Sequence, residues 1–532
     1  MPIDMPLPIG EYRLGFRSGT KKTLVLSCWL SDQRITPGEM VGVMLPNTLQ
    51  FPIIAQAVFR SGLILVPINP VAKKEDLELI FDQTRLRVVF FLDLFESCFK
   101  PIFAEYLNIR WVRCHLEDLN ESGKRLKHRS LRRYFSVSSE IFEIKSATSF
   151  RDIFKNTETS KRDRHLITLQ IKSSEATEVA MVIYTQGTTG QIKGVCLSHK
   201  NLLANSSQIK HWFNTQFSFT GDEIYHVMAP MPLFYSYGFV AHCVLMPDLG
   251  MHSLLIENPL DSKRLLKTVK HVRPEILVAI TPILSNLMSD KRFKKTDLHR
   301  LKITFISGGR TNESILNRWF DLTGCGVTNA YGLTEATAAV TMMDLNHSPP
   351  GSVGKPVTGC DLKIMRSDSV SATTGEVREI FVSGPQIFSG YLGSPDQSAM
   401  ALNENWLKTG NLGYLDENGW LYLVDRKKNV LHQSGYQVYP NEIEQVVCRY
   451  PGISSCAAIG IPEISEKEHI VLYIVLSDPE LNIVDLLRFC RSNLASYKVP
   501  QRIEVRNTLP LSPMGVVNKN QLKKELMETL KG

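Results

Sequence analysis

A run of small, hydroxyl-bearing and cationic residues at positions 184–194 constrains this chain more than any other segment. It reads Tyr-Thr-Gln-Gly-Thr-Thr-Gly-Gln-Ile-Lys-Gly. Its glycines let the backbone approach an anion, its threonines and amides offer hydrogen-bond donors, and Lys193 adds a mobile positive charge. The apolar residues 179–183 predict a buried strand before it. The pattern indicates a polyphosphate-binding loop without Walker spacing. The alternative is a flexible surface loop that binds no ligand. The companion motifs decide between these two interpretations.

Short apolar runs alternate with amphipathic stretches up to about residue 422. Residues 52–59 predict a helix opened by its proline, residues 63–66 a strand and residues 74–83 a second helix. This rhythm predicts an α/β fold with mixed parallel and antiparallel sheets covered by helices. The 532 residues, 43% of them hydrophobic, are too many for one compact core, so the chain should divide into two or more domains.

Companion motifs accompany the loop in a fixed order. They are Pro-Gly-Glu-Met-Val-Gly-Val-Met-Leu-Pro-Asn at 37–47, Val-Pro-Ile-Asn-Pro at 66–70, Pro-Met-Pro-Leu-Phe-Tyr-Ser-Tyr-Gly at 230–238, Ser-Gly-Gly at 307–309, Asn-Ala-Tyr-Gly-Leu-Thr-Glu at 329–335, Thr-Gly-Asn-Leu-Gly at 409–413, Asp-Arg-Lys-Lys at 425–428, Gly-Tyr-Gln-Val-Tyr-Pro-Asn-Glu-Ile-Glu at 435–444 and Leu-Pro-Leu-Ser-Pro-Met-Gly at 509–515. With these motifs the chain resembles the adenylate-forming superfamily, which includes acyl- and aryl-CoA synthetases, luciferases and the adenylation domains of peptide synthetases. The resemblance covers nearly the whole chain.

The resemblance implies a two-domain architecture. Residues 1–424 would form a large N-terminal domain that binds the nucleotide and the acid, with mixed sheets covered by helices. Residues 425–428 would form a hinge, with Lys428 at the hinge position. Residues 429–532 would form a small, mobile α+β lid domain, whose helix near 441–444 carries acidic residues at its N-terminus.

The resemblance also implies a reaction in two halves. A carboxylate attacks the α-phosphate of ATP, which gives an acyl-adenylate and pyrophosphate. A thiol of coenzyme A, or of a phosphopantetheine carrier, then displaces AMP. The expected cofactors are therefore ATP, Mg²⁺ and coenzyme A or the carrier, and catalysis would depend on positioning and on neutralising phosphate charge.

The residues with roles in this reaction follow from the motif matches. Those that would cradle the phosphates are Thr185, Thr188, Thr189 and Lys193. Those that would line the adenine and the adjacent acyl pocket are Ser307, Gly308, Gly309, Asn329, Ala330 and Tyr331, with Tyr331 stacking on the purine. Thr334 would reach the α-phosphate and Glu335 would hold Mg²⁺, a hard cation that suits carboxylate oxygen. Asn411 and Arg426 would contact the ribose. The catalytic set is Lys193, Thr334, Glu335 and Gln437. Gly435 would line the approach of the thiol. The alternative for Glu335 is an exposed acidic loop residue without a ligand, and the alternative for Arg426 is a surface charge at the hinge.

The segment at 230–238 indicates the class of acid. Relatives that activate amino acids place an aspartate near here, and none is present. Aromatic and aliphatic side chains suggest an apolar acid, fatty or aryl, held by burial in a pocket of Tyr235, Tyr237, Gly238 and Ser307. Both tyrosines could equally be ordinary core aromatics.

Five positions depart from the family pattern. Gln186 stands where a serine is usual, and Tyr235 stands where a histidine is common. Asn411 stands where an aspartate accepts both ribose hydroxyls, which should cost about 1–2 kcal/mol of nucleotide affinity. Val516 stands where a lysine bridges the carboxylate and the α-phosphate, and losing such a cation typically costs about 3–4 kcal/mol. Ser434 replaces a lysine found in many relatives. Adenylation could therefore be slow while thioester formation is retained.

The charge distribution narrows the range of partners. The net charge is +8, and a basic run occupies residues 124–133. This run could meet acidic lipid headgroups in a peripheral membrane contact, the phosphates of coenzyme A or an acidic acyl carrier protein. A solvated surface insertion is the favoured alternative, because the run has no apolar face. Aromatic residues do not interleave with the basic ones, so no nucleic acid partner is expected. The sequence does not define an oligomeric state.

The cysteines and the N-terminal residues indicate the cellular compartment of the protein. Ten cysteines are scattered without a CxxC pair, as expected for reduced thiols in a cytosolic protein. Residues 1–20 lack the apolar core of a signal peptide, and no apolar stretch approaches the ~20 residues of a membrane span. We expect a cytoplasmic protein.

Two functional hypotheses follow. The first is an ATP-dependent ligase of the acyl-CoA synthetase type that joins a small carboxylic acid to a thiol. The second is a catalytically weakened protein that binds a nucleotide or acyl-adenylate and acts through a partner, as Val516 and Asn411 suggest. Adenylation of an amino acid is disfavoured by the missing aspartate.

Overall fold

The computed structural model describes residues 3–5, 12–14, 16–103, 105–119, 131, 135, 143–156, 178–186, 192–217, 224–293, 298, 300–307, 313–345, 347–433, 436–462, 468–511 and 517–529. The chain divides into two compact units. Unit 1 comprises residues 1–348, 354–361 and 382–407. Unit 2 comprises residues 349–353, 362–381 and 408–532. The hinge expected at residues 425–428 stays a prediction.

The first sheet of unit 1 has eight strands in the order β20-β9-β8-β4-β3-β5-β6-β7. Its strands are β3 (Met40–Met44), β4 (Ile64–Pro67), β5 (Val88–Leu92), β6 (Arg110–Cys114), β7 (Thr148–Ser149), β8 (Val179–Gln186), β9 (Ile192–Ser198) and β20 (Gly390–Tyr391). Strands β3 to β8 pair in parallel, whereas β9 and β20 extend the sheet in antiparallel fashion. Every residue of β5 is buried, as expected for a parallel strand covered on both faces.

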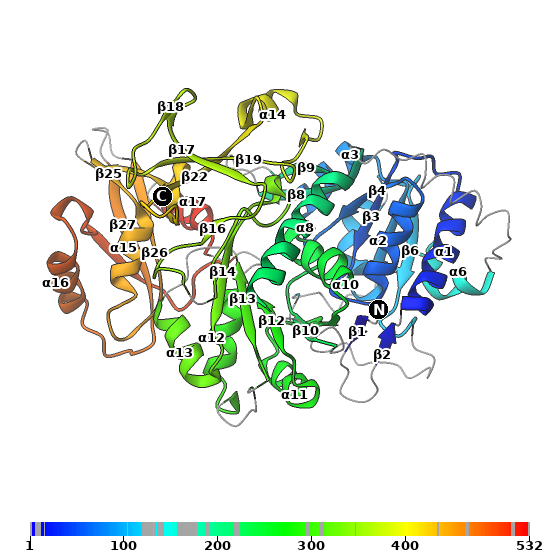
Figure 1. The fold of residues 1–532 in the computed structure, drawn as a ribbon, viewed down its shortest axis with the longest axis horizontal. Coiled ribbons are helices and arrows are strands. Elements are labelled where there is room, and N and C mark those ends of the chain that lie inside the picture. Colours follow the sequence, from blue (N-terminus) through cyan, green and yellow to red (C-terminus); the bar gives the residue numbers. More distant parts are fainter. Residues whose placement is uncertain are drawn as a thin grey trace. The chain divides into compact units, whose positions relative to one another are not determined.

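Helices cover both faces of this sheet (Figure 1). They are α1 (Phe16–Asp32), α2 (Gln50–Arg60), α3 (Lys74–Thr84), α4 (Lys100–Phe103) and α6 (Phe150–Asn156). Alternate side chains of β5 point to opposite faces: Phe91 packs in one cluster with Phe81 of α3, whereas Phe90 contacts Trp29 of α1 and Phe150 of α6. The helices and the strand predicted between residues 52 and 83 are confirmed, with small shifts at their ends.

The second sheet of unit 1 has nine strands in the order β16-β15-β14-β13-β12-β10-β11-β1-β2. They are β1 (Ile3–Met5), β2 (Tyr12–Leu14), β10 (His226–Ala229), β11 (His252–Leu255), β12 (Ile276–Ala279), β13 (Ile303–Ser307), β14 (Val327–Tyr331), β15 (Thr341–Met342) and β16 (Lys355–Pro356). Strands β10 to β14 are parallel, so their carboxyl ends share one edge of the sheet. That edge is where open α/β sheets place their ligands.

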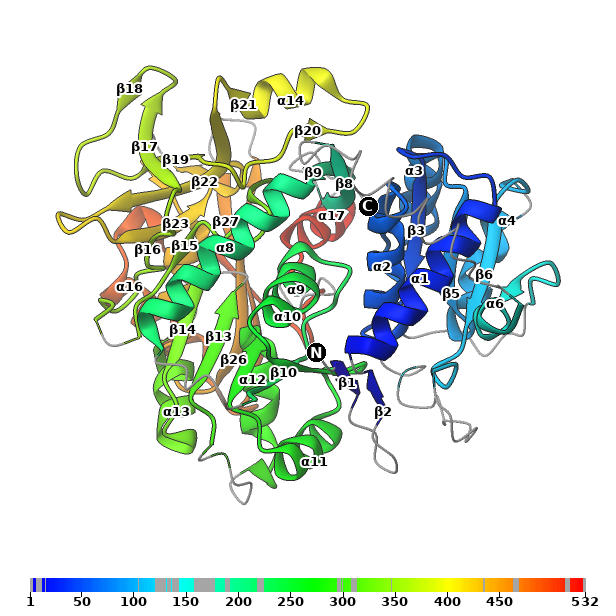
Figure 2. The ribbon, with the colours of Figure 1, turned by 45° about the vertical axis from the view of Figure 1, so that its right-hand side comes forward.

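Helices also cover both faces of the second sheet, as Figure 2 shows. They include α8 (His199–Gln216), α11 (Ser262–Val272), α12 (Thr281–Ser289) and α13 (Glu313–Thr323). Strand β13 shows the two faces: the ring of Phe305 packs against Trp212 and Phe213 of α8, while Thr304 accepts a hydrogen bond from the indole of Trp319 in α13. This packing fixes the carboxyl ends of β13 and β14.

Unit 2 contains most of a six-stranded sheet, a two-stranded ribbon and a three-stranded sheet. The strands are β17 (Asp361–Ser367), β18 (Val370–Ser371), β19 (Arg378–Ser383), β21 (Leu402–Asn403), β22 (Trp406–Leu415), β23 (Leu421–Arg426), β24 (Leu431–Gln433), β25 (Tyr436–Val438), β26 (Ile453–Pro462), β27 (Glu468–Leu476) and β28 (Arg502–Val505). Of these, β21 and a few end residues of β17, β19 and β22 belong to unit 1.

Helices α15 (Pro440–Val447), α16 (Ile483–Asn493) and α17 (Lys519–Thr529) cover the three-stranded sheet. Alternation along β27 separates two cores: Leu472 packs with α15 and α16, and Tyr473 packs with α17. The predicted helix near residues 441–444 is present and begins at Pro440. No helix among the described residues is long and apolar enough to cross a lipid bilayer.

Candidate functional site

The predicted phosphate loop connects the two strands of the β8–β9 hairpin. Thr185 lies directly across from Lys193 in the ladder. The loop tip, with Thr188 and Thr189, lies outside the described residues. Gly194 follows Lys193, and a Cβ there would come 3.0 Å from Val182 Cγ1, so a larger residue would have to displace its neighbours slightly. The strand predicted at residues 179–183 is confirmed, but it continues to Gln186, and Lys193 lies in the next strand and not in a loop.

The amine of Lys193 and the carboxylate of Glu335 lie on opposite parts of one tyrosine, Tyr391. The Lys193 Nζ atom lies 4.8 Å from the centroid of the Tyr391 ring. The Tyr391 hydroxyl donates a hydrogen bond to Glu335 Oε1 at 2.9 Å. Burial, reinforced by the Glu335 charge, raises the pKa of Tyr391, so its hydroxyl stays protonated and can donate. The predicted phosphate cation and the predicted metal carboxylate therefore belong to one cluster in unit 1.

Glu335 lies in a short 3₁₀ segment, η4 (Thr334–Ala336), just beyond β14. Its carbonyl accepts a hydrogen bond from the Phe388 amide at 2.9 Å, which fixes the backbone. Gly332 makes this turn possible, because a Cβ there would lie 1.5 Å from the Ala338 carbonyl oxygen. Sterics therefore explain the glycine of the Tyr-Gly-Leu-Thr-Glu motif.

The carboxylate of Glu335 fits a divalent cation of the magnesium type. Within the described part of the chain its second oxygen, Oε2, accepts no hydrogen bond, and the carboxylate forms no ion pair there. The same residues contain no group of three or more His, Cys, Asp and Glu side chains that could hold a metal ion. Mg²⁺ is commonly bound by one or two carboxylates together with water and substrate phosphates. Glu335 could thus hold Mg²⁺ only with oxygen ligands from a nucleotide and water.

Thr334 connects this cluster to the predicted acid-binding segment. Its hydroxyl lies 3.3 Å from the hydroxyl of Ser236, the first residue of α9 (Ser236–Phe239). Gly238 in this helix is required by packing, because a Cβ there would lie 2.2 Å from the Pro232 carbonyl oxygen. The segment at 230–238 therefore makes a tight turn against the residues proposed to meet the phosphates.

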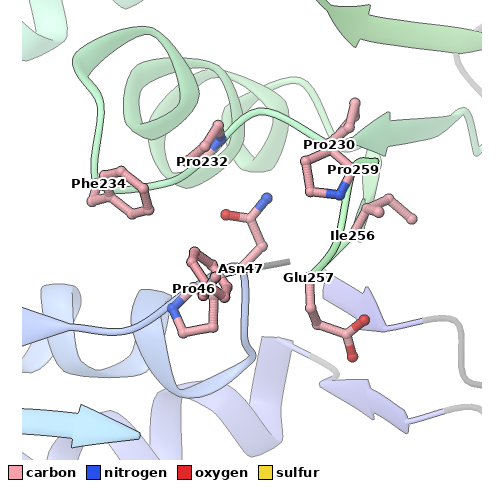
Figure 3. A pocket seen from close by; sticks show the side chains of 9 residues that line it. Pro46, Asn47, Pro230, Pro232, Phe234, Ile256, Glu257 and Pro259 are labelled. Atoms are coloured by element: carbon pink, nitrogen blue, oxygen red, sulfur yellow. The ribbon is translucent and has the colours of Figure 1, made fainter. Parts of the chain in front are cut away.

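Asn47 holds that turn in place. Its amide donates to the carbonyls of Ala229 and Met231, at 2.9 and 2.8 Å, and accepts from the Leu233 amide at 2.9 Å. Figure 3 shows this side chain between Pro46 and Pro232. The hollow beside it is lined by Pro46, Asn47, Phe135, Pro230, Pro232, Phe234, Ile256, Glu257 and Pro259, and the centre of a water molecule can reach about 10 Å³ of it. That is room for about one water molecule, so we do not assign it as the acid pocket.

The predicted aromatic residues of the acid pocket are half-buried. Tyr235 packs against Phe234 with ring centroids 4.7 Å apart. Burial raises the pKa of Tyr237. The next segment is π-helical, η2 (Val240–Leu245), and carries the fully buried His242, whose ring lies 3.3 Å from the Ser253 hydroxyl. Burial lowers the pKa of His242 to about 3, so this side chain is neutral. A charged substrate group is therefore not expected beside this helix.

The predicted adenine residues lie at the shared carboxyl edge of the parallel strands. Ser307 ends β13 and pairs with Ala330 of β14. Asn329 and Tyr331 flank Ala330 and are buried. Gly308 and Gly309 lie outside the described residues. The structure thus brings Ser307, Ala330 and Thr334 to one edge of one sheet, and adenine stacking on Tyr331 stays a prediction.

The predicted ribose residues lie in unit 2. Asn411 of β22 is directly opposite Arg426 of β23. Glu379 stabilises both strands, since its carboxylate accepts from the Gly410 amide at 3.1 Å and forms an ion pair with Lys427 at 2.7 Å. The Thr409 hydroxyl accepts from the Asn411 amide at 3.1 Å. This geometry places the two ribose residues side by side.

The remaining predicted residues of unit 2 are exposed or undescribed. Lys428 is exposed, and partial desolvation, with the charge of Arg426, lowers the pKa of its amine. Gln437 lies in β25, and its side-chain oxygen accepts a hydrogen bond from the Tyr439 hydroxyl at 3.2 Å. Gly435, together with Ser434, and Val516 lie outside the described residues.

Three supporting residues were not found by sequence reasoning: Asn47, Glu379 and Tyr391. Asn47 ends one of the motifs, which was a signal, but its partners are 182–186 residues away. Tyr391 lies 56 residues from Glu335 in a segment without a quoted motif. Only the folded chain reveals these contacts.

Two family comparisons agree with this geometry. Residues 6–392 match the family described as "AMP-binding enzyme". Residues 442–515 match the family described as "AMP-binding enzyme C-terminal domain". Together the matches cover most of both units.

Comparison with individual sequences and solved structures also finds relatives that are CoA ligases and CoA synthetases. A long-chain-fatty-acid–CoA ligase of Haemophilus influenzae is 30% identical over 516 residues, which is 96% of this chain and 90% of that ligase. Among solved structures, ATP-bound MatB from Rhodopseudomonas palustris superposes with a TM-score of 0.82 at 20% identity, covering 96% of this chain and 93% of MatB. The o-succinylbenzoate CoA synthetase MenE of Bacillus subtilis, in complex with ATP and magnesium, gives 0.75 at 22% identity, covering 96% and 94%. The structural likenesses show the fold, and they confirm the predicted α/β class with a small C-terminal domain.

Proposed function

The chain belongs to the AMP-binding enzyme family of adenylate-forming, acyl-CoA ligase-like proteins, and from this premise we propose that it is an ATP-dependent acid–CoA ligase. The proposed substrate is an apolar carboxylic acid of the fatty-acid class. Curated relatives of about 30% identity are long-chain-fatty-acid–CoA ligases, and this is the support for a fatty acid over an aryl acid.

One observation carries the proposal: Lys193, Glu335 and Tyr391 form a single cluster beside Thr334. Adenylation needs a cation and hydroxyls at phosphate oxygens and a carboxylate for the metal ion. A surface loop without a ligand would not bring a lysine and a partly unsatisfied carboxylate to one tyrosine from three distant segments of the chain. The same edge of the sheet carries Ser307 and Ala330, which would lie near the acyl-adenylate.

Each residue has a defined part in the proposed reaction. Lys193 and the hydroxyls of Thr185 and Thr334 would bind phosphate oxygens and hold the α-phosphorus in line with the attacking carboxylate. When bound, Mg²⁺ would neutralise charge on the phosphate oxygens, and Glu335 would supply its protein ligand. Asn411 and Arg426 would orient the ribose. Thioester formation would then use coenzyme A or a phosphopantetheine carrier.

The acid class follows from what surrounds α9. The segment offers Phe234, Tyr235 and Tyr237 and no carboxylate for a substrate ammonium. His242 on the following segment is buried and neutral. An apolar chain loses nothing by entering such surroundings, whereas a charged group would lose its hydration. This supports an apolar acid and argues against an amino acid.

The test is release of pyrophosphate and formation of acyl-CoA by the purified full chain with ATP, Mg²⁺, coenzyme A and fatty acids of increasing length, with aryl acids alongside. We expect turnover with the longer fatty acids. Lys193→Ala should lower it about a hundredfold by removing a phosphate cation. Lys270→Ala, at an exposed position of α11, should leave it unchanged. Silence with every acid would contradict the ligase assignment.

A second candidate function rests on Val516, which lacks the charge of the usual lysine. In this case the chain binds a nucleotide or acyl-adenylate, turns it over slowly and acts through a partner. Calorimetry with a stable acyl-adenylate mimic would show binding in both cases, and pyrophosphate release would separate them. Binding without release favours this second function.

A further inference from the structure

We propose that Tyr391 is a positioning residue that holds Glu335 and Lys193 apart, so that the carboxylate stays available to a metal ion and the amine to phosphate. This inference rests on the proposed function, because it concerns the same site. It assigns a role to a residue outside every motif from which the site was predicted.

The backbone around Tyr391 is fixed from two sides. Tyr391 pairs with Val195 of β9, the strand that also carries Lys193. Its amide donates to the Ser398 hydroxyl at 2.8 Å. Its ring packs edge-on against Phe388, with centroids 4.9 Å apart. The Phe388 amide in turn holds the Glu335 carbonyl. The tyrosine is therefore part of a rigid frame that joins the hairpin to η4.

The two ends of the side chain act on different groups. The hydroxyl donates to Glu335 Oε1 and leaves Oε2 without a hydrogen-bond partner in the described chain. This bond fixes one carboxylate oxygen and leaves the other available to a metal ion. Partners of this kind commonly change metal affinity by about 10–100-fold. The face of the ring holds the Lys193 amine through a cation–π contact.

The ring also keeps two opposite charges from pairing. Across the described residues, no ion pair joins Lys193 to Glu335, although both contact the same tyrosine. A direct pair would occupy the phosphate cation and the metal carboxylate with each other. Tyr391 gives each group a separate partner, the ring face for the Lys193 amine and the hydroxyl for the Glu335 carboxylate.

The experiment measures metal binding, independently of turnover. Mn²⁺, visible by electron paramagnetic resonance, replaces Mg²⁺ as the probe in the presence of ATP and the full chain. Tyr391→Phe keeps the ring and removes the hydroxyl, and we expect Mn²⁺ binding about 10-fold weaker. Tyr391→Ala removes the ring as well, and we expect a larger loss, together with weaker binding of metal-free ATP as Lys193 pairs with Glu335.

Two controls make the result specific. Tyr106→Phe removes another tyrosine hydroxyl from a carboxylate, that of Asp82, within unit 1 but in a different part of it. It should leave Mn²⁺ binding unchanged. In a Glu335→Gln background the Tyr391→Phe change should have no further effect, since its target is gone.

The outcomes separate this inference from the proposed function. If the wild-type chain binds no Mn²⁺ with ATP, the proposed function fails and this inference fails with it. If the wild type binds and Tyr391→Phe binds equally well, the positioning role is overturned and the function stands. An equal loss in Tyr106→Phe would also overturn it, because the effect would then be one of general stability.

Discussion

The two units fix their predicted site residues in different ways. In unit 1, Asn329 and Tyr331 are buried in a parallel strand, and Glu335 is held by Tyr391 and by the backbone of Phe388. In unit 2, Arg426 and Lys428 are exposed. A buried residue cannot change without disturbing the fold, whereas an exposed one can. Of the five noted departures from the family pattern, Asn411, Ser434 and Val516 fall in the second unit, and Gln186 and Tyr235 fall in the first.

This comparison indicates which predicted site residues are protected against substitution. The groups of unit 1 are maintained by packing, so they should survive even if the demand on adenylation is relaxed. The predicted ribose residues of unit 2 are aligned by the β22–β23 ladder, but their side chains are exposed or half-buried and can change without disturbing a core. We therefore expect nucleotide affinity to be closer to that implied by the family pattern than the rate of adenylation, which should be lower than the pattern implies.

Restoring a positive charge at position 516 is the strongest test of the claim that residues of unit 2 limit adenylation. Val516→Lys should raise the rate of pyrophosphate release about 100- to 1,000-fold, or about 3–4 kcal/mol in the barrier, because a lysine at this position would stabilise charge on the α-phosphate. Single-turnover release of pyrophosphate measures it. Val505→Lys adds the same charge at an exposed position of β28 and should change nothing. If Val516→Lys is equally without effect, the limit on adenylation does not lie in this residue of unit 2.

The origin of these contacts explains what the sequence could predict. Runs such as those of β3 and β5 are apolar and bounded by turns, so local pattern suffices for the strands. Glu335 and Lys193 lie in motifs with recognisable chemistry. The roles of Tyr391 and Asn47 cannot be predicted from the local sequence, because each side chain acquires its hydrogen-bond partners only when distant segments meet. Long-range contacts of this kind have no local signal.

Asn47 offers a test of the claim that packing maintains unit 1. Asn47→Ala removes three buried hydrogen bonds and leaves the carbonyls of Ala229 and Met231 unsatisfied. We expect a loss of about 3 kcal/mol in the free energy of unfolding. Denaturant unfolding measures it. Asn286→Ala, which loses one exposed hydrogen bond to the Leu260 carbonyl, should cost far less. Equal effects would show that this turn is not held by its buried amide.

Burial in unit 1 should also appear in the pH dependence of stability. Burial lowers the pKa of His242 from 6.5 to about 3 in the folded chain. Between these values the unfolded chain binds more protons, so stability is full above pH 6.5 and falls as the pH drops toward 3. At pH 5 the loss should be about 2 kcal/mol relative to pH 7.

Unfolding curves between pH 5 and 7 in wild type and in His242→Gln measure this contribution. The variant should show a shallower slope of stability against pH, whatever its absolute stability. His432→Gln removes an exposed histidine of unit 2 and should keep the wild-type slope. If His242→Gln keeps the wild-type slope as well, the buried histidine is not the source.

The smallest expected effect concerns the ribose residue of unit 2. Asn411→Asp should tighten AMP binding about 10-fold, or about 1–2 kcal/mol, because a carboxylate accepts both ribose hydroxyls with a full charge. Arg426 lies directly across the ladder and will attract the new carboxylate, which offsets part of the gain. Calorimetry at two salt concentrations separates the terms, since an exposed ion pair weakens in salt more than a hydrogen bond does. Asn418→Asp makes the same chemical change in an exposed turn of unit 2 and controls for net charge. Unchanged affinity in Asn411→Asp at both salt concentrations would mean that the ribose does not reach β22, and the asymmetry between the two units would then rest on Ser434 and Val516.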